Sequence, residues 1–158
     1  MRKAIEYDLE QERSFDYSKV DRNGLVNHIA QFVSGLWHIH PFGEGNTRTT
    51  AMFTILYLRS MGFDVTNDLF AKHSWYFRNA LVRANYQNVQ KGIMRNSEYL
   101  ERFFRNLILG ETNELRNWYM VVNAPEGLVA EPVRPVNRTS TEQLAVQVTE
   151  QVRSVGII

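Results

Sequence analysis

The sequence contains no cysteine. This absence excludes disulfide bonds, thiolate metal sites and cysteine nucleophiles, and it leaves the redox compartment undecided. No apolar run approaches the roughly 18 residues that a membrane-spanning helix needs, and the N-terminal stretch lacks the apolar core of a signal peptide. We therefore expect a cytoplasmic protein without a membrane partner, with an exported effector as the alternative.

An excess of charge of either sign is also lacking. The 158 residues include 18 Lys and Arg and 17 Asp and Glu, which gives a formal net charge of +1. Proteins that bind nucleic acid through bulk electrostatics are far more basic, so we expect no direct binding of nucleic acid. A hydrophobic content of 44% and a charged content of 22% are typical of a globular domain with a substantial core.

Apolar residues recur with helical spacing along most of the chain, and no segment alternates as a β-hairpin does, so we predict an all-α fold. The mixed charges of residues 6–13 indicate a short polar helix with a solvated face. Asp21 and Ser97 are predicted to cap helices, and Gly62 and Gly110 to end them. The longer helices are predicted at residues 25–36, 46–62, 67–92 (one helix or two) and 98–109, followed by a short one at 111–120.

The composition changes near residue 123. Residues 123–139 hold three of the four prolines, so we predict a Pro-rich linker or an extended arm. Residues 140–158 have an apolar stripe typical of an amphipathic helix or of the remnant of a further module, formed by Leu144, Val148, Val152 and Val155. The partner of that stripe is the core domain at residues 1–122, a second copy in a homo-oligomer, or a module outside this chain.

The stretch HPFGEGNTR, residues 40–48, combines a histidine, a carboxylate, two glycines, an asparagine and an arginine. It leads into a predicted helix, whose first turn presents unpaired N–H groups and a partial positive charge that suit phosphate. Gly43 and Gly45 let the backbone approach an anion closely, and Arg48 can offer it a forked donor. We therefore predict a phosphate site at the start of this helix.

Two further side chains in this stretch indicate chemistry as well as binding. Glu44 alone would repel phosphate, so its presence favours a cation between the two, for which Mg²⁺ is the usual choice. His40 is the nearby group best suited to proton removal at neutral pH, and Pro41 prevents a helix from continuing through it. A base, a metal ligand and a phosphate site together are typical of phosphoryl or nucleotidyl transfer.

Residues 40–48 resemble the signature of the Fic family (filamentation induced by cAMP), HPFx[D/E]GNGRxxR, in a GNTR variant. The predicted order of helices over residues 20–110 is also similar to a Fic core. The resemblance implies AMPylation, in which His40 deprotonates a Tyr, Thr or Ser hydroxyl of a target protein, the hydroxyl attacks the α-phosphorus of ATP, and pyrophosphate leaves. The choice of the α-phosphorus comes from the resemblance alone.

The resemblance also implies binding roles. Glu44 would hold Mg²⁺ between the α- and β-phosphates of ATP, and Phe42 would pin the loop into the core. Asn85 aligns with an asparagine that contacts adenine in some relatives; a solvated residue on the helix surface is the alternative. The predicted phosphate- and nucleotide-binding residues are Phe42, Gly43, Gly45, Asn46, Thr47, Arg48 and Asn85, beside the catalytic His40 and the metal ligand Glu44.

Two positions depart from the Fic signature. Thr47 replaces its third glycine, and a β-branched residue in the first turn costs only about a few tenths of a kcal/mol. Ala51 stands where the last arginine would contact the γ-phosphate, and losing such a contact costs about 1.5–3 kcal/mol. Weak binding of ATP, or a preference for another nucleotide, is therefore expected. The family's inhibitory [S/T]xxxE[G/N] motif is also missing, its nearest approach being Ser97-xxx-Glu101.

A β-hairpin flap precedes the active-site helix in family members and aligns the target as an added strand. None of the residues before His40 alternates like a hairpin, so either the chain is truncated or its target docks differently. Two alternatives to AMPylation stay open. Ala51 and the missing flap favour a catalytically quiet nucleotide-binding or regulatory module, while the intact His40 and Glu44 oppose it. A Doc-type kinase is disfavoured because its loop has a bulkier residue where Gly45 stands.

Overall fold

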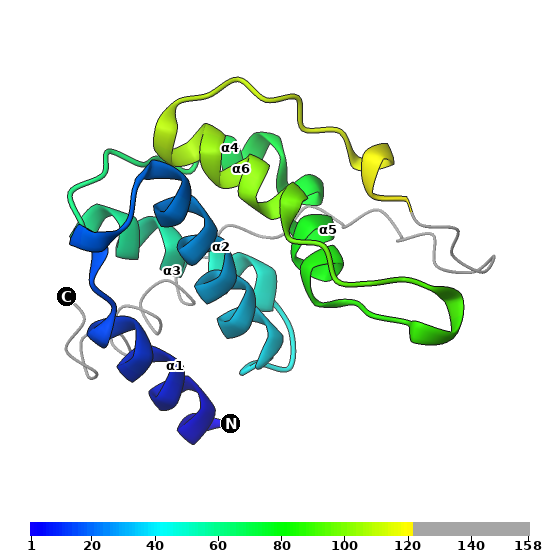
Figure 1. The fold of residues 1–158 in the computed structure, drawn as a ribbon, viewed down its shortest axis with the longest axis horizontal. Coiled ribbons are helices and arrows are strands. Elements are labelled where there is room, and N and C mark those ends of the chain that lie inside the picture. Colours follow the sequence, from blue (N-terminus) through cyan, green and yellow to red (C-terminus); the bar gives the residue numbers. More distant parts are fainter. Residues whose placement is uncertain (122–158) are drawn as a thin grey trace.

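The computed structural model describes residues 1–121. Within this part the fold is all-α, as predicted, with helices and short 3₁₀ turns and no β-strand. The helices are α1 (Arg2–Ser14), α2 (Arg22–His38), α3 (Asn46–Ser60), α4 (Asp68–Lys72), α5 (Ser74–Asn85) and α6 (Glu98–Leu109) (Figure 1). The predicted linker at 123–139 and the C-terminal helix at 140–158 lie outside the described residues.

Helix α2 is the central element and packs against α1, α3, α5 and α6 (Figure 1). Asp21 caps it as predicted, since its carboxylate accepts a hydrogen bond from the Gly24 N–H at 2.8 Å. Of the residues whose apolar spacing predicts this helix, Ile29, Phe32 and Val33 are buried, whereas Leu25 and Leu36 are half-buried. Because α2 ends at His38 and α3 begins at Asn46, this buried helix fixes where the intervening loop lies.

Aromatic side chains fill the core between α4, α5 and α6. The ring of Phe103 lies 5.0 Å from the rings of both Phe70 and Phe77, measured between centroids. Tyr76 is also buried, and this burial raises the pKa of its hydroxyl to about 12. Gly110 ends α6 in the left-handed conformation, at φ 68°, as its position in the sequence predicts.

Two predicted helix ends differ in the structure. The segment at residues 67–92 forms two helices, and α5 ends at Asn85, before a turn in which Asn88 and Ile93 form an isolated antiparallel bridge. Ser97 precedes α6 but does not cap it, because its hydroxyl donates to the Glu101 carboxylate at 2.7 Å. The cap is supplied by Asn96, whose side-chain oxygen accepts from the Glu98 N–H at 2.9 Å.

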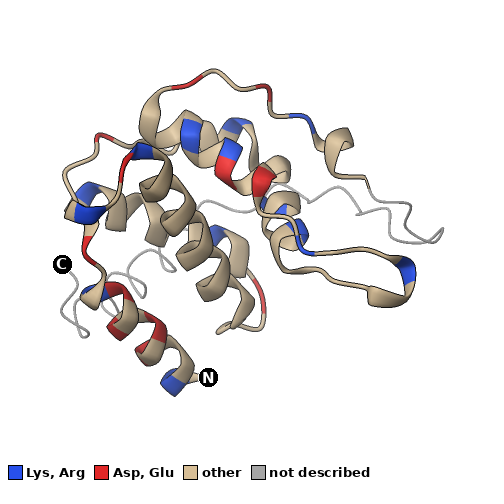
Figure 2. Ribbon diagram, in the orientation of Figure 1, with Lys and Arg blue, Asp and Glu red and all other residues tan. Residues whose placement is uncertain are grey.

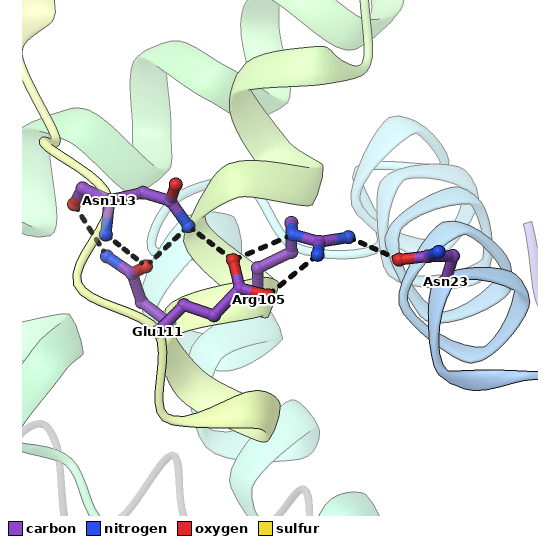
Figure 3. A network of polar contacts seen from close by, with 5 residues as sticks. Asn23, Arg105, Glu111 and Asn113 are labelled. Carbon is purple, nitrogen blue, oxygen red and sulfur yellow. Dashed lines mark hydrogen bonds and ion pairs between the residues drawn. The ribbon is translucent and has the colours of Figure 1, made fainter.

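The predicted helix at residues 111–120 is wrong, apart from a 3₁₀ turn at Asn117–Met120. Figure 3 shows the polar network that holds this segment in another conformation. Asn106 exchanges two 2.8 Å hydrogen bonds with the backbone of Asn113, and Arg105 forms a two-bond ion pair with Glu111 at 2.6 and 2.9 Å. Side chains therefore satisfy the backbone groups that a helix would have paired.

None of the helices in residues 1–121 combines the length and hydropathy that crossing a bilayer would require.

Candidate active-site loop

The loop between α2 and α3 begins with His40 in an unusual backbone conformation. Its φ is 47°, and it is the one non-glycine residue with positive φ in residues 1–121. The backbone N–H of His40 donates to the Trp37 carbonyl at 3.1 Å, and the imidazole packs edge-to-face on the Trp37 indole with centroids 4.6 Å apart. The end of α2 therefore orients the histidine.

One contact indicates which nitrogen of a neutral His40 ring carries the proton. Its Nδ1 lies 3.3 Å from the His38 carbonyl oxygen, and a carbonyl can only accept a hydrogen bond. In a neutral imidazole with this contact, the proton is on Nδ1 and Nε2 keeps its lone pair. The side chain of His40 is exposed. This geometry fits the predicted role of His40 as a base that takes a proton from an incoming hydroxyl.

Asn46 closes the loop. Its side-chain oxygen accepts from the Phe42 N–H at 3.0 Å, and its amide nitrogen donates to the Phe42 carbonyl at 2.7 Å. Asn46 is buried, whereas Phe42 is 36% exposed, so the expectation that Phe42 pins the loop into the core is wrong. Because its side-chain oxygen and one amide N–H are engaged with Phe42, Asn46 has its backbone N–H and its second amide N–H left for the predicted phosphate site.

The start of α3 is open to an anion. Gly45 is its N-cap, in the left-handed conformation at φ 76° and without a side-chain cap, and the helical bonds begin with Thr49 N–H to Gly45 carbonyl at 3.0 Å. Within residues 1–121, the preceding N–H groups of Asn46, Thr47 and Arg48 have no acceptor. Three free N–H groups at the positive end of a helix are the arrangement that binds phosphate.

Glu44 and Arg48 flank this helix start with exposed side chains, and neither forms an ion pair with another residue in 1–121. Gly43 beside them is open, since a Cβ added there would meet no atom within 4 Å. The described part of the chain has no cluster of three or more His, Asp or Glu that could hold a metal. Binding of Mg²⁺ by Glu44 together with phosphate oxygens and water stays a prediction.

The two departures from the Fic signature have distinct environments. Thr47 is not merely tolerated, because its hydroxyl oxygen accepts a 3.1 Å hydrogen bond from the Trp37 indole N–H. Ala51 is half-buried and packs against the hydrophobic core. The position that would supply an arginine to the γ-phosphate therefore contributes apolar packing instead.

Asn85 lies at the end of α5, and its amide nitrogen is engaged with the protein. It donates to the Ser34 hydroxyl at 2.8 Å and to the Leu81 carbonyl at 2.9 Å. These bonds tie α5 to α2, which makes Asn85 a bridging residue and not a solvated one. A contact with adenine stays a prediction, and the side-chain oxygen of Asn85 is the atom left to make it.

A buried polar cluster on α1 was missed by sequence reasoning. Glu12 is 5% exposed, although residues 6–13 were predicted to be a solvated face, so that prediction is wrong at this position. Its carboxylate accepts hydrogen bonds from the hydroxyls of Tyr17 and Tyr57 and lies 2.6 Å from His28 Nε2. Burial raises the pKa of both tyrosines. The available signal was the spacing that places Glu12 on the apolar face with Leu9.

A cavity of about 500 Å³ lies beside this cluster and is lined by residues of α1 and α2 and of the turn that joins them. Figure 2 shows several Asp and Glu positions along the ribbon of α1. Asp8, Glu12 and Asp16 line the cavity, and no residue of the 40–48 loop does. Burial raises the pKa of Asp8. An acidic lining disfavours phosphate, so this cavity is an unfavourable place for a nucleotide.

Comparison with known proteins agrees with the geometry of the loop. Residues 2–58 match the model of the Fic/DOC family, a segment that contains α1, α2, the whole 40–48 loop and most of α3. No curated protein and no solved structure matches the chain. The matched segment thus includes every residue of the predicted phosphate site except Asn85. This segment, which carries the histidine, the carboxylate and the helix N-terminus, is therefore similar to the Fic/DOC family.

Proposed function

We propose that this protein catalyses the Mg-ATP-dependent transfer of AMP to a hydroxyl side chain of a target protein. The observation that carries the proposal is the placement of three acceptor-free N–H groups at the start of α3 next to a histidine whose Nε2 is free. The match of residues 2–58 to the Fic/DOC family supports nucleotide transfer at the level of the family. The α-phosphorus as the point of attack rests on the resemblance to the Fic signature.

In this mechanism His40 accepts the proton of the target hydroxyl at Nε2 while the hydroxyl oxygen attacks the α-phosphorus. A new P–O bond forms to the target, the bond to the β-phosphate oxygen breaks, and pyrophosphate leaves. The N–H groups of α3 and the guanidinium of Arg48 stabilise the charge that develops on the phosphate oxygens. Glu44 would hold Mg²⁺, which when bound neutralises phosphate charge.

Two other functions are weaker candidates. Transfer of the γ-phosphate, as in Doc-type kinases, is disfavoured because residue 45 has φ 76°, where the bulkier residue of those loops would be strained. A catalytically quiet nucleotide-binding module is favoured by Ala51, which packs on the core and offers no charge to the γ-phosphate. The presence of both His40 and Glu44 opposes that module, since a module that only binds nucleotide needs no base.

The test is transfer from ATP labelled on the α-phosphate and, in parallel, on the γ-phosphate, to proteins of a cell lysate with Mg²⁺. His40→Ala removes the proposed base, and His73→Ala is the matched control because His73 precedes α5, outside the loop. Transfer of the α-label by wild type and by His73→Ala, but not by His40→Ala, is expected. Transfer of the γ-label would establish a kinase. Binding of ATP without transfer of either label would establish a quiet module.

A further inference from the structure

The residue that replaces the third motif glycine is connected to the proposed base through one aromatic side chain. The Thr47 hydroxyl oxygen, in the first turn of α3, accepts a hydrogen bond from the Trp37 indole N–H at 3.1 Å. Trp37, in the last turns of α2, also packs its ring against the His40 imidazole, with centroids 4.6 Å apart and planes at 65°. The two helix ends that border the loop therefore meet at Trp37.

The contacts of Trp37 satisfy its own indole N–H and support the unusual backbone conformation of His40. Trp37 is only 9% exposed, and a buried indole N–H requires an acceptor. Glycine at position 47 would have no side chain to accept the bond, whereas threonine has a hydroxyl at the required place. His40 also needs support, because a non-glycine residue at φ 47° persists only where its surroundings over-determine its conformation.

We infer that Thr47 and Trp37 are positioning residues for His40: Thr47 fixes the indole of Trp37, and the indole holds the imidazole in the orientation in which Nδ1 faces the His38 carbonyl. Neither residue takes a proton or forms a bond to substrate in this role. The inference rests on the proposed function for its catalytic consequence, but its structural content concerns two side-chain contacts that can be measured without nucleotide.

The experiment follows the Trp37 indole N–H and the His40 ring by NMR in the absence of ATP, and AMP transfer separately. Thr47→Val keeps the shape of the side chain and removes the acceptor, and Thr47→Ser keeps the acceptor. Thr66→Val is the matched control, since it removes an exposed threonine hydroxyl near α4. Circular dichroism first establishes that each variant is folded.

In Thr47→Val, hydrogen exchange of the Trp37 indole is expected to accelerate about tenfold or more, and the His40 ring signals to shift or broaden. Thr47→Ser should restore both, and Thr66→Val should change neither. The kcat of AMP transfer should fall about tenfold in Thr47→Val, with the KM for ATP within about twofold of wild type, because the phosphate-binding N–H groups remain. Trp37→Phe, which lacks the indole N–H, should reproduce the kcat effect.

Three results would overturn the inference. An unchanged indole signal in Thr47→Val would mean that the hydrogen bond is absent in solution. A changed indole with unchanged His40 ring signals would mean that Trp37 does not position His40. A raised KM with kcat preserved would mean that Thr47 acts on the nucleotide directly. Failure of wild type to transfer AMP, combined with the expected NMR changes, would refute the proposed function and leave the positioning role intact.

Discussion

Two sites within residues 1–121 each contain a glutamate and a histidine, and they are built in opposite ways. Glu12 and His28 lie 2.6 Å apart in a buried cluster, in which two tyrosine hydroxyls also donate to the carboxylate. Glu44 and His40 lie in the loop between α2 and α3, where both side chains are exposed and Glu44 has no ion pair within residues 1–121. α2 contributes to both sites, since it contains His28 and leads into His40.

The two sites differ in whether their polar groups are already engaged within the protein or are free to bind a ligand. A buried carboxylate with several donors is engaged in holding elements together, here α1, α2 and α3, and has no capacity left for a ligand. In residues 1–121, a carboxylate without an ion pair and a histidine with a free Nε2, near N–H groups that have no acceptor, keep their capacity for a metal, a proton and a phosphate. Changes at the loop should therefore alter activity and spare stability, and changes at the Glu12 cluster should do the reverse.

The largest expected effect is at the loop. Glu44→Gln should lower AMP transfer by roughly 100-fold, because the amide cannot hold Mg²⁺ as a carboxylate does. The free energy of unfolding should stay within about 0.5 kcal/mol of wild type, since Glu44 is exposed and unpaired in residues 1–121. Transfer from α-labelled ATP and urea denaturation measure the two quantities. A large loss of stability in Glu44→Gln would contradict the expectation that the loop contributes to activity and not to stability.

Glu12→Gln should lower the stability of the protein and leave AMP transfer nearly unchanged. The amide replaces one acceptor oxygen by a donor within a cluster of donors, so the free energy of unfolding should fall by about 3 kcal/mol. Urea denaturation checks this value, with Glu10→Gln, an exposed neighbour on α1, as the matched control. At temperatures where the variant stays folded, AMP transfer should remain within about twofold of wild type. A stability equal to wild type would mean that the cluster does not hold the helices.

Ala51→Arg tests whether position 51 of α3 can supply a contact to the γ-phosphate. An arginine here, one turn beyond Arg48, would restore the missing contact with the γ-phosphate and tighten ATP binding by about tenfold. Binding of ADP should change little because it has no γ-phosphate, so the ratio of the two dissociation constants is the measurement. Some stability, about 1 kcal/mol, should be lost because Ala51 packs against the core. Equal tightening of ATP and ADP would refute the assignment to the γ-phosphate.

The smallest expected effect is at a half-buried ion pair outside both sites. The Arg105 guanidinium holds the pKa of Glu111 below its ordinary value of 4.5, with a further contribution from Asn113. A lowered pKa in the folded state stabilises the protein above pH 4.5, and this contribution is lost as the pH falls through the folded pKa. The difference in melting temperature between wild type and Glu111→Gln should therefore be present at pH 7 and vanish at low pH.

The partner variant checks that prediction. Arg105→Gln should reduce the same pH dependence and leave the smaller part that comes from Asn113, because the lowered pKa of Glu111 comes first from this arginine (Figure 3). A difference between wild type and Glu111→Gln that persists unchanged at low pH would show that Glu111 acts through packing and not through its charge.

The sequence by itself determined the local features of this protein. Helical spacing placed the buried face of α2, since side chains three and four residues apart share a face whatever the rest of the chain does. The composition of residues 40–48 indicated a helix N-terminus open to phosphate, and the glycine at φ 76° is where the sequence has Gly45. These features depend on neighbours a few residues away, which a sequence displays directly.

The tertiary structure alone decided which polar groups are paired. Glu12 is buried because Tyr57, 45 residues later, donates to it, and Asn85 is engaged because Ser34, 51 residues earlier, accepts from it. Trp37 and Thr47 become partners only when α2 and α3 pack at the loop. Side-chain hydrogen bonds between distant residues leave no periodic signal, because each depends on where two helices meet. The same residue types therefore give a structural site on α1 and a candidate active site at the start of α3.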